Sequence, residues 1–183
     1  MIPKVMQTLR TLIILAHPAA ALVILWLFFN QRKWRKRSLV TKGSERERQI
    51  KNHESMGNNI LIYSILIVLL AFISNIFRGI IDFNSPTYYL IPGHFHGWSG
   101  ILGLIMMFGL WNLGKKTSLA RKSGSSFHRQ KEIHGRVSDI LAMLIVIHSF
   151  LGLLYLLSIL WTLSSQSFCQ CNIFALISDC LLY

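Results

Sequence analysis

The chain has 183 residues, of which 52% are hydrophobic and 14% are charged, whereas soluble domains carry about 25% charged residues. This composition excludes an ordinary soluble domain, and a nucleic-acid-binding protein is rarely so apolar, although the formal net charge is +12. A membrane protein confines its charges to particular loops, and this chain does so.

Four apolar runs follow one another along the chain, at residues 12–29, 60–77, 97–113 and 140–163. A helix of about 20 residues crosses the hydrocarbon core of a bilayer, and backbone groups inside lipid must be hydrogen-bonded internally. Each run is therefore predicted to be a transmembrane helix. The third has the weakest helix propensity because it is rich in glycine. We predict an all-α integral membrane four-helix bundle over residues 1–163, followed by a tail over residues 164–183.

The cations are concentrated in two segments between these runs. The first segment holds nine of them: Arg32, Lys33, Arg35, Lys36, Arg37, Lys42, Arg46, Arg48 and Lys51. The second segment holds seven: Lys115, Lys116, Arg121, Lys122, Arg129, Lys131 and Arg136. The positive-inside rule places both segments on the cytoplasmic or stromal face of a plasma or thylakoid membrane, with both termini opposite. Membrane lipid is then the expected partner of these charges, and no nucleic acid is expected.

The predicted tail contains all three cysteines of the chain, Cys169, Cys171 and Cys180. An odd number of cysteines without flanking histidines is poor zinc-binding geometry. Two of these cysteines can form a disulfide if the tail faces an oxidising compartment, but inert cysteines are the simpler interpretation.

Seven histidines in so apolar a chain need an explanation, because polar side chains at membrane depth are costly and usually functional. The predicted topology sorts them into two layers. His17 and His96 lie near the outer face, whereas His53 and His134 precede the second and fourth runs at the inner face. His148 follows His134 by 14 residues, about 21 Å along a helix, which returns it to the outer layer.

The residue four positions after a histidine lies on the same face of a helix, and a small side chain there leaves room for a flat ring such as haem. This criterion selects five histidines, with the small residue in parentheses: His17 (Ala21), His53 (Gly57), His96 (Gly100), His134 (Ser138) and His148 (Gly152). It disfavours His94 and His128, which are followed by Trp98 and Glu132.

Layer and spacing together predict two ligand pairs. His17 pairs with His96, and His53 pairs with His134, each pair on diagonal helices of the bundle. Neutral imidazole is a suitable axial ligand of haem iron, and two of them leave no open site for oxygen. The alternatives are a His17 bonded to a backbone carbonyl freed by the adjacent proline, a solvated His53 in a basic loop, and His148 or His94 as a replacement ligand.

Four short segments resemble the cytochrome b561 family: His17-Pro18, Lys51-Asn52-His53, His96-Gly97-Trp98-Ser99-Gly100 and Glu132-Ile133-His134. They are also similar to a group of cyanobacterial and plastid membrane proteins of unknown function that are related to this cytochrome. The resemblance covers about residues 12–163, and His-x-Trp-x-Gly is its most specific element. It implies two b-type haems, with His17 and His96 as ligands of the outer haem and His53 and His134 as ligands of the inner one.

The chain departs from that family where Gly97 replaces the usual serine, where His148 has no counterpart, and in lacking the additional flanking helices of full-length members. The leading hypothesis is transmembrane electron transfer through two bis-histidine haems, as in a transmembrane oxidoreductase, with the electron donor and acceptor unidentified. The alternative is a non-catalytic membrane subunit or assembly factor of a membrane complex, such as a photosynthetic one. A homodimer or a larger membrane complex is compatible with both hypotheses.

Overall fold

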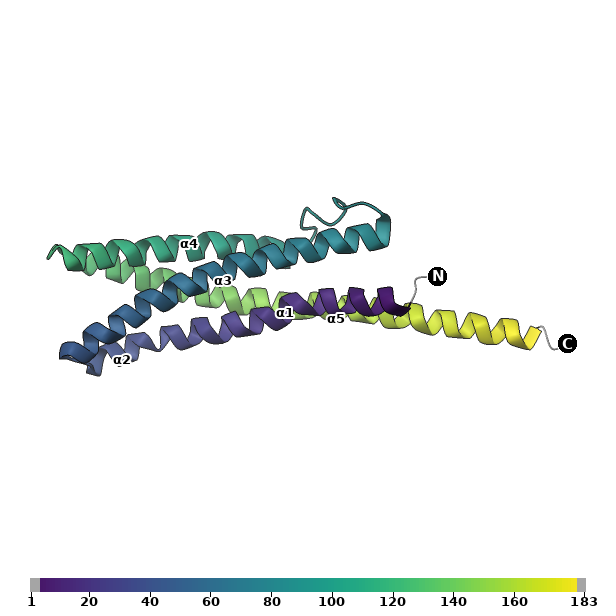
Figure 1. Cartoon of the computed structure of the whole chain (residues 1–183), viewed down its shortest axis with the longest axis horizontal. Helices are drawn as coiled ribbons and strands as arrows, with labels where there is room; N and C mark the ends of the chain where they lie inside the picture. The colour runs from purple at the N-terminus through teal and green to yellow at the C-terminus, as the bar shows by residue number, and fades with distance from the viewer. Residues whose placement is uncertain (1–3, 181–183) are drawn as a thin grey trace.

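The computed structural model describes the backbone of residues 4–180 and the side chains of residues 8–37 and 40–161. The described chain contains only helices and connecting segments, so the all-α prediction is confirmed. In chain order the helices are α1 (Lys4–Arg32), α2 (Trp34–Val40), α3 (Gly43–Phe83), α4 (Phe95–Lys122) and α5 (His128–Cys180). Figure 1 shows the long helices lying side by side as one elongated bundle.

The helices α1, α3, α4 and α5 are long and apolar enough to cross a membrane, and each contains one of the four predicted spans. They extend beyond the apolar runs, because α3 begins at Gly43 and α5 begins at His128. Much of the two basic segments is therefore helical and not looped as expected. The helix α5 also continues into the predicted tail as far as Cys180, whereas the side chains of the three cysteines lie outside the described residues.

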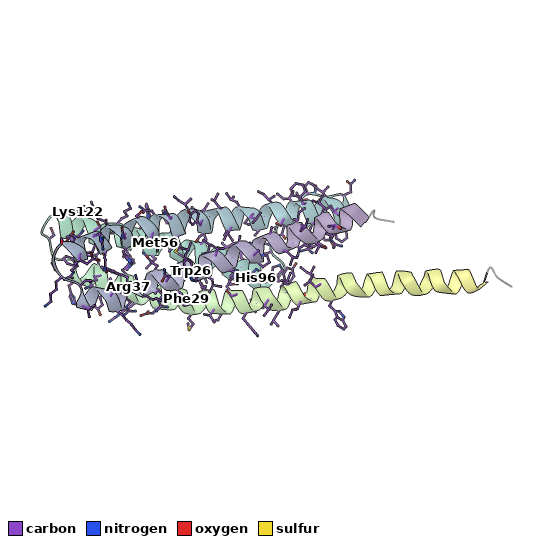
Figure 2. All side chains as sticks on the ribbon, turned by 60° about the horizontal axis from the view of Figure 1, so that its bottom comes forward. Trp26, Phe29, Arg37, Met56, His96 and Lys122 are labelled. Atoms are coloured by element: carbon purple, nitrogen blue, oxygen red, sulfur yellow. The ribbon has the colours of Figure 1, made fainter. Side chains whose placement is uncertain are left out.

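The long helices form a bundle in which α1 packs on α3, α3 on α4, and α4 on α5, while α1 also touches α5. Consequently α1 and α4 lie on one diagonal, and α3 and α5 lie on the other. Figure 1 shows α2 at one end of the bundle, and α1 and α5 pointing their terminal ends toward the other. In Figure 2, Arg37 and Lys122, one from each basic segment, lie at the same end, and His96 lies toward the opposite one. We call the end with the basic segments the inner end and the opposite end the outer end.

The bundle is packed by apolar side chains at mid-height and is also apolar on its outside. The buried core consists of Phe28, Ile60, Leu61, Met107, Leu110, Leu141 and Ala142. Large apolar side chains such as Leu22, Ile105 and Phe150 are 69%, 64% and 59% exposed. An apolar surface of this extent marks a membrane-facing or partner-facing protein, in agreement with four membrane-spanning helices.

At the outer end, the connection between α3 and α4 folds back over α3. The helix α3 ends at Phe83, and its C-cap residue Asn84 has a φ of 50°, in the left-handed conformation. The N–H groups of Asn84 and Ser85 donate to the carbonyl groups of Ile80 and Gly79, which caps the last turn. The segment that follows carries Tyr88 and Tyr89 back toward the bundle.

Candidate functional site

The structure brings together both histidine pairs that layer and spacing predicted. His17 on α1 faces His96 on α4, with ring centroids 6.1 Å apart and an angle of 74° between the ring planes. His53 on α3 faces His134 on α5, with centroids 6.4 Å apart and an angle of 75°. Two imidazoles that bind one metal ion from opposite sides, with bonds of about 2.0–2.1 Å, hold their ring centroids roughly 6 Å apart. Both pairs therefore have the separation expected of opposite ligands of a single metal ion.

Three of these four histidines are oriented by a hydrogen bond from Nδ1 to a backbone carbonyl. The bonds run from His17 to Ile67 (3.3 Å), from His96 to His148 (3.1 Å) and from His134 to Leu110 (3.1 Å). A carbonyl only accepts, so Nδ1 carries the proton and Nε2 keeps the lone pair that binds metal. This is the arrangement in which proteins hold a metal-binding histidine in place. The carbonyl that His17 uses belongs to α3, and not to the part of α1 around its proline.

His53 lies in a different setting from the other three. It is half-buried on the polar first part of α3, whereas the alternative considered from the sequence was a solvated histidine in a loop. The Trp34 ring of α2 stacks on it with centroids 5.5 Å apart, and Gln31 Nε2 donates to its backbone carbonyl over 2.7 Å. Its Nδ1 is buried and has no hydrogen-bond partner among the described residues. The extension of α3 and the cover from Trp34 together leave His53 only partly exposed to water.

Two glycines allow the imidazoles of α4 and α5 to lie against the backbone of the neighbouring helix. A Cβ atom on Gly152 of α5 would lie 2.7 Å from Cε1 of His96, and one on Gly100 of α4 would lie 3.0 Å from Cε1 of His148. We expected each glycine to leave space beside the histidine of its own helix. The structure shows a different arrangement, in which each glycine makes room for the histidine of the neighbouring helix.

A cavity of about 320 Å³ lies beside the outer pair and is lined by His17 and His96 and by apolar side chains of all four long helices. Cofactor-binding pockets have volumes of about 300–1,000 Å³ and are mainly apolar, with a few polar groups that fix orientation. Two imidazoles with ring centroids 6.1 Å apart beside such a cavity fit a haem in the outer site. The inner histidines His53 and His134 repeat the ring separation of the outer pair but are not among the residues that line this cavity.

His148 lies beside the outer pair but is aligned differently. Its ring stacks on His96 with centroids 4.1 Å apart and planes only 20° apart, and its Nδ1 lies 2.9 Å from Oγ of Ser99. Ring nitrogens of His17, His96 and His148 all lie within 4.8 Å of one another. A metal ion lies in the plane of each imidazole that binds it, and two rings stacked nearly parallel do not point at one ion. His148 is therefore placed to flank His96 and to orient it through its backbone carbonyl.

His94 has a structural role at the start of α4. It is the N-cap residue of that helix, and its Nδ1 accepts a hydrogen bond of 3.1 Å from the backbone N–H of Gly97. Burial lowers the pKa of His94, and the neighbouring His96 and Arg78 lower this pKa further. The lowered pKa favours the neutral imidazole, which is the form that accepts the capping bond.

Four side chains beside the two pairs were not anticipated from the sequence: Trp34, Arg78, Ser99 and Tyr155. Ser99 follows His96 by three residues, and Tyr155 follows His148 by seven. Helical spacing places both on the same faces as these histidines, so the periodicity of the helix, without the requirement for a small residue, could have found them. Trp34 comes from a segment that we expected to be a loop, and a single arginine directly after an apolar run gives no indication of what it faces.

Comparisons of the chain with protein-family models, with curated proteins and with solved structures found no match. The resemblance to cytochrome b561 therefore stays a prediction drawn from short segments. A proposal for function accordingly depends on the geometry and chemistry of the two histidine pairs.

Proposed function

We propose that the chain is a transmembrane electron carrier that binds two b-type haems, one at each histidine pair. The observation that supports it is the repetition of one geometry at two levels, with centroid separations of 6.1 and 6.4 Å and interplanar angles of 74° and 75°. A histidine that merely satisfies its polar atoms inside a bundle needs a hydrogen-bond partner for Nδ1 but no second imidazole opposite its Nε2. Structural histidines therefore do not account for two facing pairs.

The chain's own residues would hold and separate the two sites. His17 and His96 would be the ligands of the outer site, and His53 and His134 those of the inner site. A bis-histidine haem supplies a one-electron couple and leaves no open position for oxygen. The carbonyl that fixes His17 belongs to Ile67, which follows His53 by 14 residues on α3, so the two levels are about 21 Å apart along that helix. The buried core packs the space between them and excludes water.

A three-histidine site for a small metal ion is the second candidate for the outer end, because His17, His96 and His148 lie so close together. Three imidazoles with an open fourth position are typical of catalytic zinc sites. The parallel stacking of His148 on His96 weighs against this site. So does the inner pair, which repeats the geometry of the outer one without forming a three-ligand group in the described chain.

Absorption spectroscopy of the purified protein, produced in cells with an ample haem supply, tests the proposal. We expect a reduced-minus-oxidised spectrum of b-type haem and two haems per chain by pyridine haemochrome. His96→Ala and His134→Ala should each remove one of the two haems. His128→Ala is the matched control, because His128 is exposed at the start of α5 and should leave both in place. Haem-free protein from such cells would refute the proposal.

His148→Phe separates the two candidates. This change keeps a flat ring beside His96 and keeps the backbone carbonyl at 3.1 Å from its Nδ1, so a haem protein should retain its full haem content. A three-histidine metal site would instead lose one ligand. Zinc bound by the wild type but not by His148→Phe, with haem absent from both, would favour the second candidate.

A further inference from the structure

Arg78 is a buried cation inside the outer end of the bundle. Its side chain belongs to α3, is only 8% exposed, and lines the same cavity as His17 and His96. A charged side chain at membrane depth is costly, and such residues almost always pair with an opposite charge or line a functional pathway. The charge of Arg78 therefore calls for an anionic partner.

The described part of the chain does not supply that anion. Each of its carboxylates pairs with a cation other than Arg78: Asp82 with Arg10, Asp139 with Arg32 and Arg35, Glu45 with Arg48, Glu47 and Glu54 with Arg121, and Glu132 with Arg136. Burying a cation without a counter-charge leaves a desolvation cost that neutral groups offset only in part.

The contacts that Arg78 does make are neutral. Its Nη1 donates to the hydroxyl of Tyr155 over 3.2 Å, and its Cζ lies 4.3 Å from the centroid of the Tyr89 ring. Its Nε is buried and has no hydrogen-bond partner among the described residues. A guanidinium presents several N–H donors in a planar fork that matches the two oxygens of a carboxylate. The contacts orient the fork but leave its charge uncompensated.

We propose that Arg78 binds a carboxylate group of a ligand seated in the outer cavity. The ring centroid of Tyr155, which Arg78 contacts, lies 4.0 Å from that of His94, and the centroid of His94 lies 6.0 Å from that of His96. The guanidinium and the histidine pair therefore belong to one continuous cavity wall. Two sources share this chemistry. One is a propionate of a haem held by His17 and His96, which rests on the proposed function, and the other is a free carboxylate that enters from the outer end.

Haem binding by the haem-free protein in detergent tests the first source. The titrations compare haem b with its dimethyl ester, which lacks the negative charges, in a His134→Ala background so that only the outer site is loaded. Arg78→Gln should weaken the binding of haem b by about 10- to 100-fold, the effect of losing a hydrogen bond to a charged group, and should leave the ester unchanged. Arg78→Lys keeps the charge but not the planar fork, so its affinity for haem b should lie between that of the wild type and that of Arg78→Gln. Arg10→Gln is the matched control, because Arg10 lies near the same end but pairs with Asp82 over 2.9 Å.

Thermal unfolding of the haem-free wild-type chain with citrate as the probe tests the second source. A ligand that binds only the folded state raises the unfolding temperature, so citrate should stabilise the wild type and not Arg78→Gln. A loss confined to haem b assigns the carboxylate to the propionates, and citrate stabilisation that depends on Arg78 assigns it to a free ligand. Equal affinity of the wild type for haem and ester, together with no effect of citrate, overturns the proposal even if no Arg78 variant folds. A wild type that binds no haem refutes the proposed function, and citrate then decides on Arg78 alone.

Discussion

Gly152→Ala is the smallest change that tests whether His96 is held at a fixed position in the outer site. The added Cβ would lie 2.7 Å from Cε1 and 3.0 Å from Nδ1 of His96, whereas ordinary van der Waals contact begins at 3.4 Å. The imidazole must therefore move by about 0.7 Å, the difference between 3.4 and 2.7 Å. An imidazole with a free Nε2 can swing away. With a bound iron it is fixed at Nε2, and at Nδ1 it is fixed by the 3.1 Å bond to the carbonyl of His148.

Overpacking of this kind costs about 1–3 kcal/mol, and here it falls mainly on the haem-bound state. We therefore expect Gly152→Ala to weaken the binding of the outer haem by about 5- to 150-fold. The fold itself should persist, because alanine is favoured over glycine within a helix by about 1 kcal/mol. Haem titration followed by absorbance measures the effect, with the inner haem as an internal standard.

Gly109→Ala on α4 is the control, since a Cβ there meets no atom within 4 Å, and it should bind both haems as the wild type does. Outer-haem affinity of Gly152→Ala equal to that of the wild type would refute the reasoning. His96 would then not be constrained between Gly152 and an iron, and its assignment as an axial ligand would be wrong.

Two further changes test the roles assigned to neighbouring residues. His94→Ala should lower the free energy of unfolding by about 0.5–2 kcal/mol through loss of the cap, whereas His94→Asn should keep the cap, and both should keep the full haem spectrum. Loss of haem from His94→Asn would instead show that His94 is a ligand of the haem iron. Asp139→Asn removes the carboxylate shared by Arg32 and Arg35, but because these pairs are largely exposed, the loss of stability should be at most about 1 kcal/mol and should shrink in high salt. A larger loss in thermal melts would show that the contact between α1 and α5 depends on this cluster.

Helix order and charge position were sufficient to predict the bundle and which histidines would face each other. In an antiparallel bundle with short connections, alternate helices lie on diagonals, so His17 on the first helix must face the third, where His96 is. The basic segments then set which end of each helix lies at which level. This argument uses only the order of elements and the rise per residue, and both can be read from the sequence.

The rotation of each helix about its own axis could not be predicted in this way. Whether Gly152 faces space beside His148 or the ring of His96 depends on how α5 is turned toward α4, and a periodic pattern of small residues does not specify this. The start of α3 was missed for a related reason. The apolar run begins only at residue 60, but the helix begins at Gly43. The polar stretch between them contains no proline and is supported by contacts such as the hydrogen bond from Gln49 to Glu45.

The two sites share a ligand geometry but differ in the charges beside them, and under the proposed function this difference predicts a direction for electron transfer. At the outer site Arg78 is 8% exposed and has no carboxylate partner in the described chain, whereas near the inner site Arg32 and Arg35 share Asp139 at the surface. A cation stabilises the reduced, more negative state of a nearby haem, and more strongly in an apolar interior than in water. Under the proposed function the outer haem therefore has the higher midpoint potential, and electrons pass from the basic end outward. In a redox titration Arg78→Gln should lower the outer potential and leave the inner one unchanged, and an unaltered outer potential would contradict this direction.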